Sequence, residues 1–221
     1  MEITQRTDTS STAAPEPHAN YPSLTPAYTF NFRIGGPASP VGGLTRGQPL
    51  TVVHIIGGRV TSAPRQSDAP LSTGAGGVGG GDGSGSGNTG NPREAEAVDE
   101  LPRLEATVRG QGIDFVRNDP DGGRMRLDAG LVVEDGDGAM IHIHYTGIVE
   151  INDQLSAILA GRRDARDTEF GASFIHVTFE TGSEKYKELE RGVFVGAGRF
   201  ILDRGGLGVE YKVSRVGWKP P

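Results

Sequence analysis

The residue of this sequence best placed for acid–base chemistry is Asp114. Counting in twos from Leu104, the apolar face of a predicted strand continues across Gly110 and Gly112 to Asp114. Alternate strand residues share a face, so we expect this carboxylate to point into an apolar interior. Desolvation there would raise its pKa and make it a general acid or base near neutral pH. Two interpretations stay open: acid–base chemistry, or a structural hydrogen bond to neighbouring backbone. The count assumes no bulge, and a bulge at the two glycines would change it.

Two further side chains are predicted to accompany Asp114. His54 is in phase with Val52 and Ile56 along one strand, and Tyr145 is in phase with Ile143 along another. A histidine can transfer a proton near pH 7, and a tyrosine hydroxyl can donate to a developing oxyanion. We predict Asp114, His54 and Tyr145 as the catalytic group. The alternative is that His54 and Tyr145 are ordinary core residues.

His142 and His144 form an H-x-H pattern, which places both imidazoles on one face of a strand. A metal site would also need a carboxylate and a third histidine. Glu150 lies about 20 Å further along the strand at ~3.3 Å per residue, and His176 would contribute only from an adjacent strand. We therefore predict a solvated outer face here, with no metal and no cofactor.

Composition excludes several classes of protein. The 221 residues include no cysteine, which rules out disulfides, thiolate metal sites and cysteine nucleophiles. The net charge of −6 comes from mixed signs without a basic stripe, so nucleic acid is not an expected partner. The N-terminus lacks an apolar signal segment, and no run is long enough to span a membrane. We expect a cytoplasmic protein.

Two segments are expected to be disordered. Residues 1–26 are rich in Ser, Thr, Pro and Ala, and cannot bury enough apolar surface to order themselves. Residues 65–101 combine a glycine-rich run with an acidic run, which is typical of a flexible linker. The rest of 27–221 is expected to form a single domain around this insertion.

The remaining pattern is that of an all-β protein. Alternation predicts strands at about 28–34 and 49–56, followed by a series after the insertion, and one short helix near 152–162 capped by Asn152 or Asp153. The later strands are expected at about 102–109, 111–117, 124–134, 139–149, 173–181, 192–200 and 207–215. One helix among many closely spaced strands indicates an antiparallel, lipocalin-like β-barrel. A barrel of about eight strands can enclose one small ligand.

The order of several short motifs resembles the DUF3237 (UPF0311) family of small β-barrel proteins. The motifs include Thr45-Arg46-Gly47, Gln111-Gly112-Ile113-Asp114-Phe115, Phe179-Glu180-Thr181-Gly182 and Phe194-Val195-Gly196. The resemblance implies a lipocalin-like barrel without a dedicated cofactor. Through this resemblance the chain is also similar to fungal members of the family that belong to natural-product pathways and act on polyketide-derived intermediates.

Three residues are predicted to bind the substrate. Arg46, in a glycine-rich loop, would clamp an acidic ligand at the barrel mouth; the alternative is that it braces the loop. The resemblance adds Phe115, which stands where the family typically has Trp, and Glu190, which stands in place of a Trp-Leu-Asn run. These departures imply a pocket whose chemistry differs from that of the family.

The function predicted from the resemblance is that of a cofactor-independent cyclase or isomerase. It would act by proton transfer on a polyketide-like aromatic intermediate, for example by adding a hydroxyl across a C=C bond. The alternative is a non-catalytic carrier of small molecules, and a third hypothesis is an H-x-H metalloenzyme. A homodimer through an exposed strand stays open.

Overall fold

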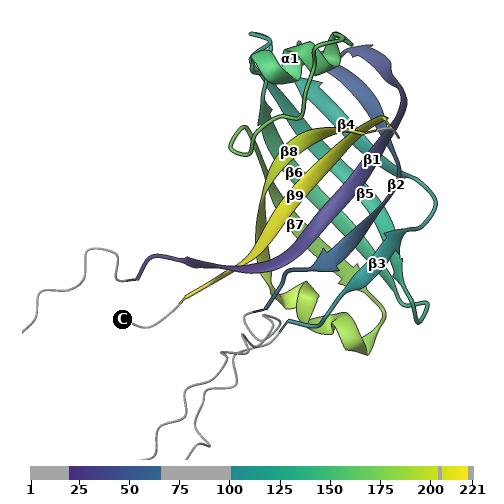
Figure 1. Ribbon diagram of the computed structural model, residues 1–221, viewed down its shortest axis with the longest axis vertical. Coiled ribbons are helices and arrows are strands. Elements are labelled where there is room, and N and C mark those ends of the chain that lie inside the picture. The colour runs from purple at the N-terminus through teal and green to yellow at the C-terminus, as the bar shows by residue number, and fades with distance from the viewer. Residues whose placement is uncertain (1–19, 66–100, 204–205, 219–221) are drawn as a thin grey trace, which may run out of the picture.

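Alternating apolar and polar residues build most of the described chain into strands (Figure 1). The computed structural model describes residues 20–65, 101–203 and 206–218. Its strands are β1 (Ser23–Gly43), β2 (Pro49–Ser62), β3 (Glu105–Val108), β4 (Gly112–Asn118), β5 (Arg124–Asp135), β6 (Met140–Glu150), β7 (Ser173–Thr181), β8 (Val193–Asp203) and β9 (Gly206–Gly217). The helices are α1 (Asp153–Leu159) and the 3-10 helix η2 (Glu184–Arg191).

The sheet is antiparallel and closes on itself. The order β1-β9-β8-β7-β6-β5 continues through β3 and β4 to β2, and β2 pairs with β1. Both β3 and β4 lie between β2 and β5, so they occupy one position of the barrel as an interrupted strand. Gly110, with a φ of +70°, lies at the interruption. The predicted antiparallel β-barrel with one short α-helix is confirmed.

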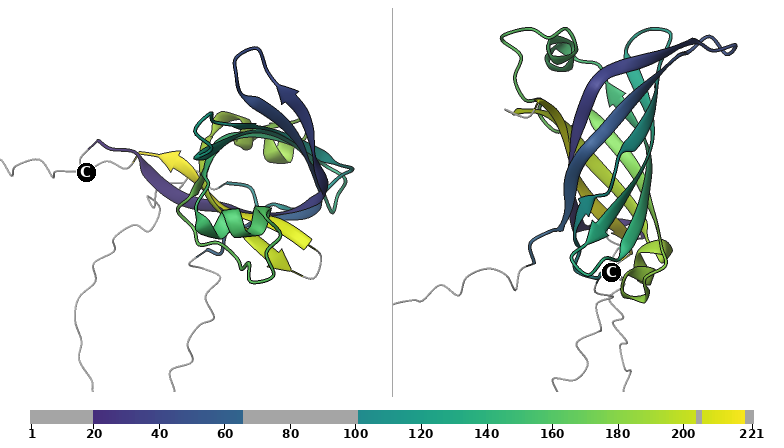
Figure 2. Two further views of the ribbon diagram at one scale, coloured as in Figure 1. Left: turned by 90° about the horizontal axis from the view of Figure 1, so that it is seen from above. Right: turned by 90° about the vertical axis from the view of Figure 1, so that its right-hand side faces the viewer.

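A helix lies at each end of the barrel (Figures 1 and 2). At the α1 end, the β1–β2 hairpin extends past the rim, and Asn152 caps α1 by accepting a 2.9 Å hydrogen bond from the N–H of Leu155. The predicted cap is confirmed. At the opposite end, η2 buries Tyr186 and Leu189, whose spacing places both on one face. η2 was not predicted from the hydrophobic pattern.

The structure describes only part of the two segments that were predicted to be disordered. β1 begins at Ser23, inside the predicted tail 1–26, and its first residues pair with the end of β9 from Ser214 to Gly217. Residues 1–19 and 66–100 lie outside the described residues. The predicted disorder is therefore wrong for residues 23–26, which form a strand, and it stays a prediction for 1–19 and 66–100.

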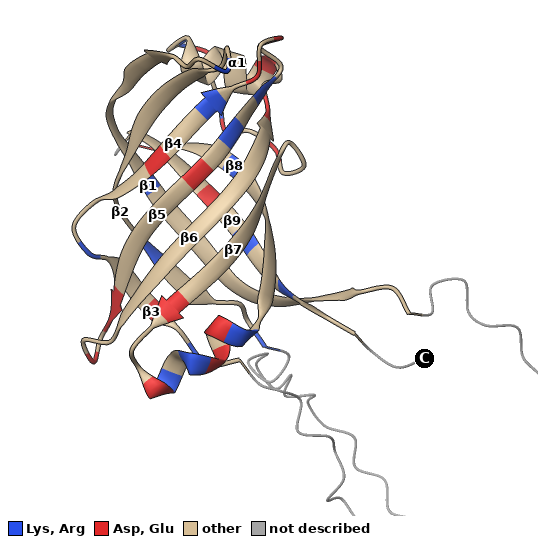
Figure 3. Cartoon of the chain, turned by 180° about the vertical axis from the view of Figure 1, so that it is seen from behind, with Lys and Arg blue, Asp and Glu red and all other residues tan. Residues whose placement is uncertain are grey.

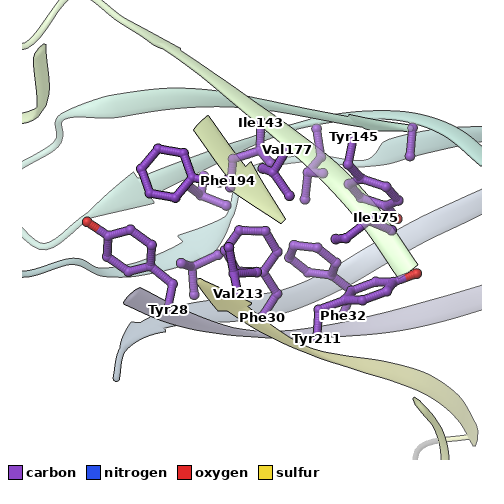
Figure 4. Close-up of a cluster of buried hydrophobic side chains, with 14 of the residues drawn as sticks. Tyr28, Phe30, Phe32, Ile143, Tyr145, Ile175, Val177, Phe194, Tyr211 and Val213 are labelled. Atoms are coloured by element: carbon purple, nitrogen blue, oxygen red, sulfur yellow. The ribbon is translucent and has the colours of Figure 1, made fainter. Parts of the chain in front are cut away.

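Aromatic side chains from several strands pack against one another inside the barrel (Figure 4). Phe179 and Phe194 meet edge to face with ring centroids 5.0 Å apart. Tyr145 stacks on Phe32 at 6.4 Å, with the two rings nearly parallel. Tyr186 and Leu189 of η2 belong to this packed core, whereas Ile158 of α1 lines a cavity, so the barrel is packed near η2 and hollow near α1.

The outer surface has charges of both signs and also exposed apolar side chains, among them Phe174 and Val193. Figure 3 shows acidic and basic residues interspersed over β4, β5 and η2. Among the described residues, no helix is both long and apolar enough to cross a membrane.

Candidate functional site

A cavity of about 450 Å³ occupies the α1 end of the barrel. Its walls are mostly apolar side chains from β1, β2, β4, β5, β6, β8, β9 and α1, among them Ile34, Val53, Val116, Met125, Leu127, Ile158 and Phe200. Its polar lining comes from Thr51, Asp114, Asn118, Tyr145 and Tyr211. This volume and this balance of apolar wall and few polar groups are typical of small-molecule sites.

Asp114 lies inside the barrel, as its parity predicted, and only 6% of it is exposed. One carboxylate oxygen accepts a hydrogen bond of 3.0 Å from the backbone N–H of Asp128 on β5. Desolvation by burial raises its pKa from 3.8 to about 6, and the hydrogen bond from Asp128 opposes this rise. The carboxyl group is therefore able to give or take a proton near neutral pH.

The β4–β5 pairing explains how Asp114 is held. Asp114 on β4 lies opposite Ala129 on β5, and the next pair of opposite residues along the two strands is Arg117 with Arg126. Between these two pairs, the N–H of Asp128 bonds to the Asp114 side chain. Both interpretations made for Asp114 thus have support: the carboxylate braces a neighbouring strand and also faces the cavity.

Two tyrosines line the same cavity as Asp114. Tyr145 on β6 and Tyr211 on β9 are each 1% exposed, and their ring centroids lie 5.6 Å apart. Burial raises the pKa of both phenols, and the nearby charge of Asp114 raises them further. Both hydroxyls therefore stay protonated near neutral pH and can act as hydrogen-bond donors.

Tyr145 was predicted from its parity, whereas Tyr211 was not selected. The signal for Tyr211 was present in the alternation of Val209, Tyr211 and Val213, all of which are buried on the inner face of β9. Asn118, at the end of β4, was likewise not selected, although it has the same parity as Asp114.

The expectation that His54 faces the interior is wrong. Val53 and Ile55 point inward on β2, which turns His54 and its in-phase neighbour Ile56 to the outer face, where Ile56 is 43% exposed. Phe115 also faces outward and is 40% exposed, because it follows the inward Asp114 on the same strand. Neither residue lines the cavity.

Arg46 and Glu190 also lie away from the cavity lining. Arg46 is exposed in the turn between β1 and β2. Glu190 lies on η2, at the other end of the barrel, where it accepts a 2.7 Å hydrogen bond from the N–H of Thr181. The pKa of Glu190 is lowered, and this hydrogen bond is the largest cause. Of the six residues predicted for the site, the structure brings together Asp114 and Tyr145.

The two histidines of the H-x-H pattern face outward, as predicted. His142 contacts Glu180 at 2.8 Å, and His144 contacts Asp128 at 3.0 Å. Within the described part of the chain, no group of three or more His, Cys, Asp or Glu side chains is arranged to hold a metal ion.

Comparisons with known proteins identify a family that the chain matches and solved structures with a similar fold. The model of the family "Protein of unknown function (DUF3237)" matches residues 22–216. No curated protein matches. A conserved protein of unknown function from Rhodopseudomonas palustris is 19% identical, with a TM-score of 0.59 over 89% of this chain and 99% of that one.

Two further solved structures are similar. A β-barrel-like protein from Acinetobacter baumannii is 19% identical, with a TM-score of 0.56 over 91% of this chain and 100% of that one. An enzyme from Penicillium herquei is 18% identical over 93% of this chain and 100% of that one. Its TM-score is 0.48.

Proposed function

The chain belongs to the DUF3237 family, and we propose that it is a cofactor-independent enzyme that isomerises or cyclises a largely apolar, polyketide-like aromatic molecule by proton transfer. The observation that carries this proposal is the placement of Asp114. A carboxyl group with a pKa near neutrality lines a mostly apolar cavity together with two buried tyrosines. Such a shifted pKa in a cleft is typical of groups that transfer protons.

The reaction class is intramolecular addition of a hydroxyl across a conjugated C=C bond. The Asp114 carboxylate takes the hydroxyl proton as the oxygen forms a bond to one alkene carbon. The π electrons move onto a conjugated carbonyl as an enolate, to which Tyr145 or Tyr211 donates a hydrogen bond. The other alkene carbon then receives a proton from the Asp114 carboxyl as the enolate collapses. Substrate and product have the same formula, and Asp114 returns to its starting state.

The test uses extracts of a strain of the source organism in which the gene has been deleted. Purified protein in EDTA buffer is expected to convert one compound into an isomer of equal mass, which in D2O carries one carbon-bound deuterium. Asp114→Asn should abolish this conversion. Glu180→Gln is the matched control, because Glu180 lies on the outer face of β7 and should leave conversion intact. A product without carbon-bound deuterium would contradict the proton-transfer mechanism.

A carrier is the second candidate, and the bond between Asp114 and the N–H of Asp128 favours it. That bond gives the carboxylate a structural role that requires no chemistry. A carrier would retain a compound from the same extract through gel filtration and leave it unchanged. Retention without conversion, equal for wild type and Asp114→Asn, would replace the enzyme proposal with this one.

A further inference from the structure

The cavity has a second polar end, which the proposed reaction does not use. Asn118 lies on the inward face of β4 in the same phase as Asp114, with Val116 between them. Four residues of strand separate the two polar side chains by about 13 Å, at ~3.3 Å per residue. Apolar side chains such as Val116, Met125 and Ile158 line the space around them.

The amide oxygen of Asn118 is an acceptor without a partner. Its Oδ1 atom is buried, and no donor in the described part of the chain bonds to it. Buried polar atoms in folded proteins nearly always have a partner in protein, water or ligand. Asn118 lines the cavity, and rotation of its side-chain amide would let this buried acceptor take a hydrogen bond from a donor of a bound molecule, a bond that the protein alone does not supply.

We infer that Asn118 is a specificity-determining residue, which selects ligands carrying a hydroxyl or N–H donor at the end remote from Asp114. This inference rests on the ligand-binding cavity of the proposed function. The ligand class is an elongated, apolar molecule with a polar group at each end: one group meets Asp114, and the other donates to Asn118 Oδ1. A molecule whose remote end only accepts hydrogen bonds would leave Asn118 unpaired.

The probes for the test are three rigid two-ring compounds: 4-hydroxybiphenyl, 4,4′-dihydroxybiphenyl and 4-hydroxy-4′-methoxybiphenyl. The methoxy compound retains the second oxygen but has no donor there. Titration calorimetry is expected to show the diol binding about tenfold more tightly than the methoxy compound, equivalent to about 1.4 kcal/mol for one hydrogen bond. In Asn118→Leu, which is similar in size and has no acceptor, the two compounds should bind equally.

A matched control and a stability measurement complete the test. Asn31→Leu makes the same chemical change on β1 away from this cavity, and should keep the tenfold preference. Asn118→Leu removes an unpaired acceptor, so its melting temperature should not fall. A melting temperature well below wild type would show that Asn118 has a structural bond, and would overturn the inference.

Three binding outcomes separate failure of this inference from failure of the proposed function. A preference for the diol that survives in Asn118→Leu but disappears in Asp114→Asn would overturn the role of Asn118 and leave the cavity proposal standing. Equal binding of the diol and the methoxy compound by the wild type would also overturn it. Failure of all three probes to bind would contradict the binding cavity itself, and this inference with it.

Discussion

The backbone N–H of Asp128 donates to the carboxylate of Asp114 inside the barrel, while the Asp128 side chain lies on the opposite face of the same strand. There it contacts His144 at 3.0 Å and Arg117 at 3.4 Å. A single residue of β5 thus connects a buried carboxyl to charges on the surface. The charge of Asp128 raises the pKa of Asp114, and that of Arg117 lowers it, although both effects are smaller than that of burial.

The first prediction concerns the stability of Asp114→Asn as a function of pH. Burial raises the pKa of Asp114 in the folded state from 3.8 to about 6, so the folded state favours the protonated carboxyl group. The wild-type protein therefore loses stability as pH rises from about 4 to about 6 and this group ionises. The shift corresponds to about 3 kcal/mol at most. Asparagine can still accept from the Asp128 N–H but does not ionise. The variant should therefore be more stable than wild type at pH 7.5 by about 1–3 kcal/mol, and the difference should vanish below about pH 4.

Urea unfolding of both proteins between pH 3.5 and 8 measures this difference directly. Other carboxylates titrate identically in the two proteins and cancel. A gain in stability that did not depend on pH would mean that Asp114 has an ordinary pKa, which contradicts its proposed role as an acid or base.

The second prediction concerns the surface charges behind Asp114. Asp128→Asn removes a negative charge and should lower the pKa of Asp114, whereas Arg117→Gln removes a positive charge and should raise it. The carboxyl carbon resonance of Asp114, followed by NMR during a pH titration, measures both shifts. Glu180→Gln, elsewhere on the outer surface, serves as the control. Shifts of the same sign in the two variants would show that structural disturbance outweighs charge.

The sequence predicted the barrel because most strands have one apolar face. On β5, for example, Leu127 and Leu131 are inward while Arg126 and Asp128 are outward, as expected. On β2 both faces are apolar, since Val52 and Val53 are adjacent, as are Ile55 and Ile56. Parity alone could not tell which set faces inward, and the choice that placed His54 inside was wrong.

The site was partly predictable for a related reason. Parity along single strands identified Asp114 and Tyr145, but their proximity to Tyr211 depends on how far the strands are offset when the barrel closes. β4, β6 and β9 are distant in sequence and meet only across the interior. That offset is set by pairing registers and by the interruption at Gly110, which the hydrophobic pattern does not encode.

The third prediction assigns the proposed oxyanion contact. Tyr145→Phe and Tyr211→Phe keep the aromatic packing and remove a donor, so the variant that removes the contact should lower kcat by about 100-fold with little change in KM. Steady-state kinetics with the compound identified from extracts measures this. The control is Tyr28→Phe: its hydroxyl donates to the carbonyl of Pro102 at 2.9 Å, and it does not line the cavity. Unchanged kcat in both cavity variants would exclude phenol donors from the reaction.

The fourth prediction concerns the opposite end of the barrel, where η2 is attached through Asp135. One oxygen of this carboxylate accepts bonds from the Tyr186 hydroxyl at 2.7 Å and from Lys185 Nζ at 3.0 Å. The other accepts from the N–H groups of Asp137 and Ala139. These bonds, first among them that from Tyr186, hold the pKa of Asp135 well below its usual range. Their stabilisation is therefore present above the unfolded-state pKa of about 3.9 and is lost as pH falls.

Tyr186→Phe should accordingly lower the melting temperature at pH 7 and lower it less near pH 3. Its sign at neutral pH is opposite to that of Asp114→Asn, which should be more stable than wild type there. Thermal unfolding at several pH values tests this, with Glu188→Gln as the control, since Glu188 on the same helix makes an exposed ion pair with Arg191. The cavity near α1 lies at the other end of the barrel, so affinity for 4-hydroxybiphenyl should not change. A loss of affinity in Tyr186→Phe would show that η2 and the cavity are coupled, contrary to the separation of the packed end of the barrel from the hollow end.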